Sequence, residues 1–288
     1  MANHRIYQYT SIGRSLDLTR PGNKAVAVLM AIAAVLGAAI AWVESGPGFS
    51  VVQQALYFLL ILFASWALAR ELDPDDALAA FISMAAAMLA AVLVDFPGIL
   101  IVYTTLFLVR IVNRSSGLVA RKTDSFMVMA LSIGVIYTFQ SPLFGVVAAL
   151  AFMLDGSLRE PLRHQWVFGL ICLGATVVYM VDHEFGLTQF SVPDTLFEWF
   201  SLLLLLIFAL DTLLLKKVRS KGDVNARLLD VGRVRGGMAV GFLAALTGIG
   251  QSQVVVIVVA TIAGLVVGMA IRKGFKAPVK ESQAKDGK

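Results

Sequence analysis

The sequence predicts an all-α, polytopic membrane protein with about ten transmembrane helices, short loops and both termini in the cytoplasm. Of its 288 residues, 58% are hydrophobic and only 15% are charged, and the mean hydropathy is +0.81. A soluble domain has about 45–50% apolar and about 25% charged residues. The apolar residues form long unbroken blocks rather than the stripe of a soluble helix. In a bilayer only helices and closed barrels satisfy their backbone polar groups, and these blocks lack the alternation of barrel strands.

Ten apolar segments carry this prediction. In chain order they are 25–43, 50–69, 77–94, 98–112, 125–139, 142–155, 166–181, 196–215, 236–249 and 252–271. A straight crossing takes about 20 residues. Several segments are shorter, so we expect their helices to extend into the flanking residues or to stop partway.

The lysines and arginines indicate the topology. When the N-terminus is placed in the cytoplasm, all 24 of them fall on the inner side and none on the outer side, as the positive-inside rule requires. The sequence therefore predicts a cytoplasmic arm at 1–24, one transmembrane domain at 25–271 and a disordered basic cytoplasmic tail at 272–288. The membrane would be the plasma membrane, or the inner membrane in a bacterium. The net charge of +5 follows from this topology and does not point to nucleic acid.

Two pairs of segments leave the crossing number open. Residues 125–155 turn at Gln140-Ser141-Pro142, and residues 236–271 turn near 248–252. Interrupted hairpins of this kind are typical of transporter binding sites. Ser141 and Pro142 also fit the N-cap and first position of an ordinary helix. We expect two full crossings in each pair, with a re-entrant hairpin as the alternative.

Asp211 is the strongest candidate for a substrate-binding or proton-binding residue. It lies in the segment LLLIFALDTLLLKK, about 7 Å inside the boundary marked by Lys216. An acid at that depth is costly and must face protein or water. We expect Arg110, at the cytoplasmic end of its own segment, as a partner. The alternative is a purely structural ion pair or a carboxylate that reaches the interface.

A second candidate site lies around Asp155, which ends the segment 142–155. Asp124 begins the preceding segment at the same face, and basic residues surround both acids in sequence. Acids and arginines at one membrane face are suited to Mg²⁺ and a lipid phosphate; the alternative is that they are ordinary helix ends. The arginines expected to contact anionic lipid or phosphate are Arg114, Arg121, Arg159 and Arg163. With one cysteine and three dispersed histidines, no metal site and no cofactor is predicted.

The acidic run ARELDPDD at 69–76 suggests a metal site but is better explained as a helix start. Asp73 fits an N-cap, Pro74 the first position and Asp76 the capping-box position. Glu71 has no structural role in this interpretation.

Small residues suggest helix packing in the last two segments. Gly237 and Gly241, and Gly264 and Gly268, are spaced four apart, which lets helices approach closely. We expect these two helices to pack together; a homodimer through these faces or an unknown membrane partner is the alternative. The basic loop 216–235 is expected to form an amphipathic helix on anionic lipid.

Three functions remain open. The first is a small transporter of a solute or lipid, with Asp211 at its site. Ten helices in under 300 residues are similar to the drug/metabolite transporters in size and layout, without a shared motif. The second is an enzyme acting on a lipid phosphate at the cytoplasmic face. The third is a membrane subunit or scaffold without chemistry of its own.

Overall fold

The described part of the chain folds into ten α-helices and one short 3-10 helix. The computed structural model describes residues 4–14, 16–93, 98–184, 193, 195–249 and 255–275. The 3-10 helix η1 spans His4–Gln8, and the α-helices are α1 (Pro21–Ser45), α2 (Phe49–Leu72), α3 (Ala77–Leu93), α4 (Ile99–Asn113), α5 (Lys122–Thr138), α6 (Pro142–Asp155), α7 (Gln165–Asp182), α8 (Leu196–Leu214), α9 (Val231–Leu246) and α10 (Val256–Phe275). Within these ranges there is no β-strand, only an isolated bridge between Lys221 and Leu228. Each predicted apolar segment corresponds to one helix. Most of the predicted tail lies outside the described residues.

Five helices, α1, α2, α7, α8 and α10, are long and apolar enough to cross a membrane. Helices α3, α4 and α6 are apolar but shorter. Large apolar side chains stand exposed along the outer helices, among them Val35 on α1, Val181 on α7 and Leu213 on α8. Soluble proteins rarely expose apolar patches of this extent. The length, composition and exposed apolar faces of these helices fit a membrane protein.

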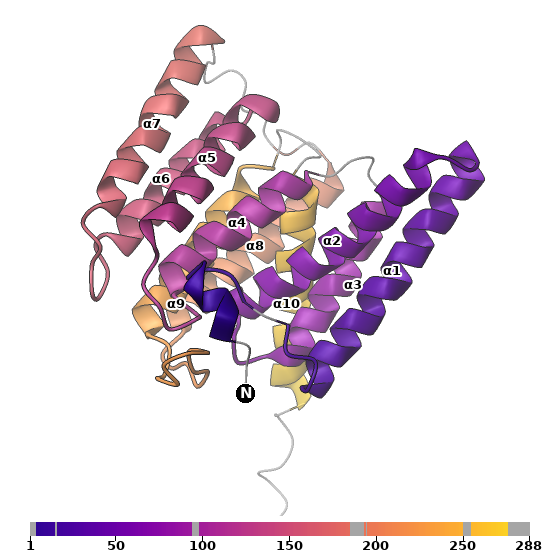
Figure 1. The fold of residues 1–288 in the computed structure, drawn as a ribbon, viewed down its shortest axis with the longest axis horizontal. Helices are drawn as coiled ribbons and strands as arrows, with labels where there is room; N and C mark the ends of the chain where they lie inside the picture. Colours follow the sequence, from indigo (N-terminus) through magenta and orange to yellow (C-terminus); the bar gives the residue numbers. More distant parts are fainter. Residues whose placement is uncertain are drawn as a thin grey trace, which may run out of the picture.

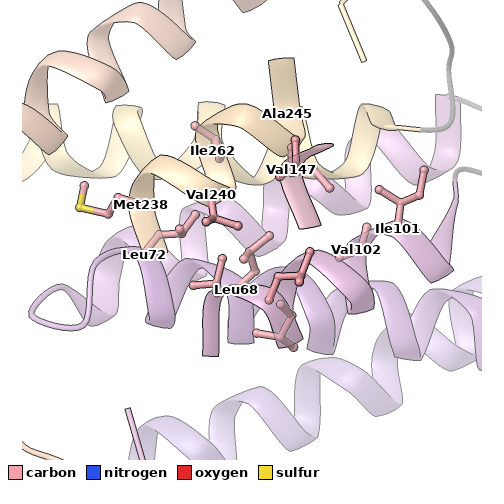
Figure 2. Close-up of a cluster of buried hydrophobic side chains, with 14 of the residues drawn as sticks. Leu68, Leu72, Ile101, Val102, Val147, Met238, Val240, Ala245 and Ile262 are labelled. Carbon is pink, nitrogen blue, oxygen red and sulfur yellow. The ribbon is translucent and has the colours of Figure 1, made fainter. Parts of the chain in front are cut away.

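The helices are arranged around α4, which has neighbours on every side. It packs against α2, α5, α6 and α9, and most of its residues are buried. Helix α1 lies at one side of the bundle and α7 at the other, with α4, α8 and α9 between them (Figure 1). Figure 2 shows apolar side chains of α2, α4, α6, α9 and α10 that meet in the core, including Leu68, Val102, Val147, Val240 and Ile262.

The glycines of the last two helices mark close approaches to other helices, not to each other. A Cβ on Gly264 would lie 2.6 Å from the Cα of Ser83, and one on Gly268 would clash with Ala79. Both contacts are with α3. The corresponding contacts of Gly237 and Gly241 are with α4 and α2. Helices α9 and α10 do contact each other as predicted, but the predicted role of these glycines in that contact is wrong, because α3, α4 and α2 cover them.

Two helices begin at residues other than those predicted, and each is capped by an aspartate. Helix α3 is capped by Asp76, whose Oδ1 accepts a hydrogen bond from the Ala79 amide at 3.1 Å, because Asp73 instead ends α2. Helix α9 begins at Val231, where Asp230 accepts from the Arg233 amide at 3.0 Å. Residues 215–230 are irregular, so the expected amphipathic helix in this loop is wrong.

The turn between α5 and α6 has the predicted form. Helix α6 begins at Pro142 with Ser141 as N-cap, although the Ser141 side chain makes no capping bond. Gln140, at the tip, is exposed and has a left-handed φ of 52°. The turn near 248–252 lies largely outside the described residues.

All described lysines and arginines gather at one end of the bundle. There the even-numbered helices end and the odd-numbered helices begin, and the N-terminal arm lies beside the loop that precedes α9 (Figure 1). We call this end the basic face; it consists of residues 4–24, the loops 73–76, 114–121, 156–164 and 215–230, and the adjoining helical turns.

Candidate functional site

The buried carboxylate of Glu71 organises the centre of the basic face. Its Oε1 accepts hydrogen bonds from Arg14 Nη1 at 3.1 Å and from Arg110 Nε at 3.0 Å. Arg14 also forms a two-point pair with Asp223, at 2.6 and 2.8 Å. Arg110 donates its second bond to the Ile12 carbonyl at 3.1 Å. These bonds join the arm, α2, α4 and the loop before α9.

Electrostatics keep this network charged. Burial acts to lower the pKa of the Arg14 guanidinium, but the neighbouring Glu71 and Asp223 outweigh it and raise the pKa above its ordinary value. Because two arginines share Glu71, each group in the network has a charged partner. Burying an ion of either sign without a partner costs several kcal/mol of desolvation free energy. Removing one partner of a buried ion pair destabilises the folded state by about 3–5 kcal/mol.

Asp155 lies in a second buried cluster. It has no exposed surface and accepts from Arg114 Nε at 2.9 Å and from Arg233 Nη1 at 2.7 Å. Gln165 Nε2 donates to the other carboxylate oxygen at 3.1 Å. Two cations already surround this acid, so it is not placed to receive a metal ion or a phosphate from solvent.

The arm is fastened to the start of α5 by a third set of bonds. Asp124 Oδ2 accepts from the amide of Ser11 at 2.6 Å and from its hydroxyl at 2.5 Å. The Ser11 hydroxyl in turn accepts from the Arg121 amide at 3.0 Å. The Arg121 guanidinium donates to the carbonyls of Tyr7 and Gln8. The Arg121 side chain is therefore held by hydrogen bonds to the arm.

The predicted site residues Asp211, Arg110 and Asp155 do not share a cavity. Asp211 pairs with Lys273, whose Nζ lies 2.6 Å from Oδ1, while Arg110 is engaged by Glu71. The expected pairing of Asp211 with Arg110 is wrong because α4 and α8 are separated by the helices between them. Each predicted residue instead has its own local partner.

The other predicted arginines differ in whether protein groups engage their side chains. Arg114 and Arg121 are held by protein acceptors. Arg159 is 78% exposed and lies 3.7 Å from Asp230. Arg163 is exposed and makes no ion pair within the described part of the chain. Of these four arginines, Arg159 and Arg163 have exposed side chains that make no hydrogen bond with the described residues.

Asp211 borders a cavity at the basic face. This cavity, the α8–α10 groove, has a volume of about 630 Å³. Its apolar lining comes from α2, α8, α9, α10 and the loop after α8, and its charged lining comes from the loops and from the end of α10. The lining residues are Leu72, Asp73, Pro74, Asp75, Asp211, Leu214, Leu215, Lys216, Lys217, Val218, Arg219, Val234, Met238, Met269, Arg272 and Lys273.

Three cations of the groove have no acceptor for their side chains among the described residues. Arg272 pairs with Asp73 and Asp76, and Lys273 pairs with Asp211. The side chains of Lys216, Lys217 and Arg219 are exposed and make no hydrogen bond or ion pair with the described residues. The groove therefore combines apolar walls with unpaired positive charge.

The acidic loop at the edge of the groove holds the chain after α8 in place. Asp75 accepts from the amide of Ser220 at 2.8 Å, from its hydroxyl at 2.7 Å and from the Arg219 amide at 2.9 Å. Burial acts to raise the pKa of Asp75, but these hydrogen bonds outweigh it and lower the pKa below its ordinary value. Burial raises the pKa of Asp73, against the opposing effect of Arg272.

No cluster of three or more histidine, cysteine or acidic side chains that could hold a metal ion occurs in the ranges that the structure describes. In the acidic run at 71–76, Glu71 belongs to the buried ion-pair network and Asp73 ends α2. Asp75 holds the loop after α8, and Asp76 caps α3.

Sequence reasoning missed Glu71, Arg233 and Lys273. Glu71 carried a signal, because it was the one acid of its run without a structural role. Arg233 and Lys273 were counted only as topology markers. Nothing in the spacing of either residue identifies its partner.

Comparisons with protein-family models, with curated proteins and with solved structures find no match for this chain.

Proposed function

We propose that the chain is a polytopic membrane carrier that crosses the bilayer ten times with its basic face in the cytoplasm. Five helices of membrane-spanning length support this, as does the alternation of helix starts and ends between the two faces. The gathering of lysine and arginine at one face is the pattern of a cytoplasmic surface.

We further propose that the α8–α10 groove binds an anionic amphiphile, meaning a molecule with an apolar chain and a negatively charged head. One observation carries this: apolar walls and unpaired cations line the same cavity. Leu214 and Met238 offer contacts for a chain, and Lys216 and Lys217 offer charge for a head. Lysines near anionic lipid contribute about 1 kcal/mol each.

Exchange of the ion pair between Asp211 and Lys273 would control the uptake and release of the anionic amphiphile by the groove. An anionic head that enters the groove competes with Asp211 for Lys273. A proton on Asp211 would release Lys273 in the same way. The Asp211 side chain is 19% exposed and the Lys273 side chain 63%, so water and a ligand head can reach the lysine side of the pair.

Lipid translocation in reconstituted vesicles tests this proposal. Vesicles containing the protein and phosphatidylglycerol with a fluorescent head label would be treated with a membrane-impermeant quencher, so that labelled lipid brought outward loses its signal. We expect Asp211→Asn to slow translocation about tenfold or more, which corresponds to about 1.4 kcal/mol. Asp182→Asn, an exposed acid at the other end of the bundle, is the matched control. An unchanged rate in Asp211→Asn would remove Asp211 from the proposed role.

The geometry favours this carrier over an enzyme centred on Asp155. That acid has no exposed surface and is bonded to Arg114 and Arg233. Arg159 and Arg163 remain as proposed surface contacts for anionic lipid, because both side chains are exposed.

A further inference from the structure

A second, smaller cavity lies beneath the N-terminal arm and shares no lining residue with the α8–α10 groove. This cavity, the arm cavity, has a volume of about 110 Å³ and is lined from the arm, α1, α2, α4 and the loop before α9. A buried water needs about 10–15 Å³ of such space, so the arm cavity accommodates a group of several heavy atoms.

The charges around the arm cavity do not balance. Its lining includes four arginines but only three carboxylates: Arg14, Arg20, Arg70 and Arg110 against Asp17, Glu71 and Asp223. Glu71 pairs with both Arg14 and Arg110, and Asp223 pairs with Arg14. Arg20 lies 3.6 Å from Asp17. The lining is left with one positive charge in excess.

Arg70 carries the excess charge. Its half-buried side chain lines the cavity yet makes no hydrogen bond or ion pair with any residue that the structure describes. The acids that follow it in sequence are engaged elsewhere: Asp73 pairs with Arg272, and Asp75 holds Ser220. A partly desolvated guanidinium without an acceptor is costly, so a site for an acceptor is expected here.

We propose that the arm cavity binds a singly charged phosphate group, with the Arg70 guanidinium as its main ligand. The planar fork of arginine matches two phosphate oxygens, and one negative charge neutralises the excess. Trp66 and Phe63, one and two turns before Arg70 on α2, form an aromatic wall toward the apolar part of the helix. The phosphodiester of a phospholipid and free dihydrogen phosphate share this chemistry. The inference does not depend on the carrier function.

Tryptophan fluorescence can observe this site directly. Trp42, Trp166 and Trp199 would be replaced by phenylalanine, so that Trp66 is the only tryptophan in the full chain. The protein in an uncharged detergent at about pH 6 would be titrated with inorganic phosphate and, separately, with short-chain phosphatidylglycerol. We expect a saturable change in Trp66 emission with at least one of the two. A response to phosphate alone identifies the free ion, and a response to the lipid alone identifies the headgroup.

Variants assign the response to Arg70. We expect Arg70→Gln to raise the dissociation constant at least tenfold, and Arg70→Lys, which keeps the charge but loses the fork, to raise it severalfold. Lys122→Gln, at an exposed position at the start of α5, should leave it unchanged. Thermal unfolding checks that each variant is folded; if Arg70→Gln is not, Arg70→Lys decides. Absence of a saturable response to both ligands, or an unchanged dissociation constant in the folded Arg70 variants, would overturn the proposal.

Discussion

Arg14 and Glu71 are 57 residues apart in the chain, yet Arg14 Nη1 lies 3.1 Å from Glu71 Oε1. This contact fastens the N-terminal arm to the end of α2. Because Arg110 of α4 shares the same carboxylate oxygen, the arm is part of the packed structure and not a loose extension. Stability should therefore depend on an acid that the sequence alone left unexplained.

Replacing Glu71 with glutamine should destabilise the protein by about 3 kcal/mol. The substitution keeps the shape of the side chain but leaves the buried guanidinium of Arg110 without its charge partner. Thermal unfolding in detergent would measure this as a lower melting temperature. Glu44→Gln, at an exposed position on the opposite face, should change little. Equal melting temperatures for the two variants would show that the network does not stabilise the fold.

Asp155→Asn should produce a loss of similar size, about 3 kcal/mol. Arg114 and Arg233 both bond to this fully buried carboxylate, and an amide cannot compensate two cations. Unfolding by denaturant, followed by tryptophan fluorescence, would measure the change in free energy. If the variant were as stable as the wild type but lost a Mg²⁺-dependent activity, Asp155 would be catalytic rather than structural.

The positions of the helices could be predicted because continuous apolar blocks separated by charged loops leave few alternatives to helices. The boundaries moved where charged residues belong to the helices themselves. Helix α9 begins at Val231 rather than at 236, because Arg233 points into the protein at Asp155. A rule that ends helices at basic residues cannot anticipate a buried arginine.

The candidate site could be predicted only in part. The depth of Asp211 in an apolar segment marked it correctly as a residue in need of a partner. That partner, Lys273, lies 62 residues away, and a pairing of such separation depends on which helices are neighbours. One sequence with ten similar apolar segments does not specify those neighbours. The α8–α10 groove could not be predicted from the sequence either, because it forms between helices whose neighbours the sequence does not specify.

The anchoring of the loop by Asp75 should depend on pH. The hydrogen bonds from Arg219 and Ser220 lower the pKa of Asp75 in the folded state below the ordinary value of about 3.9. The contribution of Asp75 to the free energy of unfolding is therefore fully present at a pH above its ordinary pKa. It is lost as the pH falls through the pKa of Asp75 in the folded state. Because Asp75 is exposed, we expect its hydrogen bonds to add no more than about 1 kcal/mol to the free energy of unfolding at neutral pH.

Comparison of Asp75→Asn with the wild type across pH would measure this contribution. The difference in melting temperature should be present at pH 6–7 and shrink on acidification below about pH 4. Asp182→Asn serves as the control. A difference that grew on acidification would have the wrong sign for a carboxylate with a lowered pKa.

Cysteine labelling should place the turn between α5 and α6 on the outer side. In a Cys172→Ala background, which has no other cysteine, Gln140→Cys should react in intact cells with an impermeant maleimide. Lys217→Cys, at the basic face, should react only after permeabilisation. Protection of position 140 would favour a re-entrant hairpin over two crossings.

The central claim is that the α8–α10 groove holds an anionic amphiphile. Native mass spectrometry of the protein released from detergent, in an Arg70→Gln background that removes the arm cavity as a competing site, measures this most directly. We predict preferential retention of phosphatidylglycerol over phosphatidylcholine. We also predict that the double variant Lys216→Gln, Lys217→Gln weakens this retention about 30-fold, since two lysines contribute about 2 kcal/mol. Equal retention of the two lipids, or a preference that the double variant leaves intact, would contradict the account.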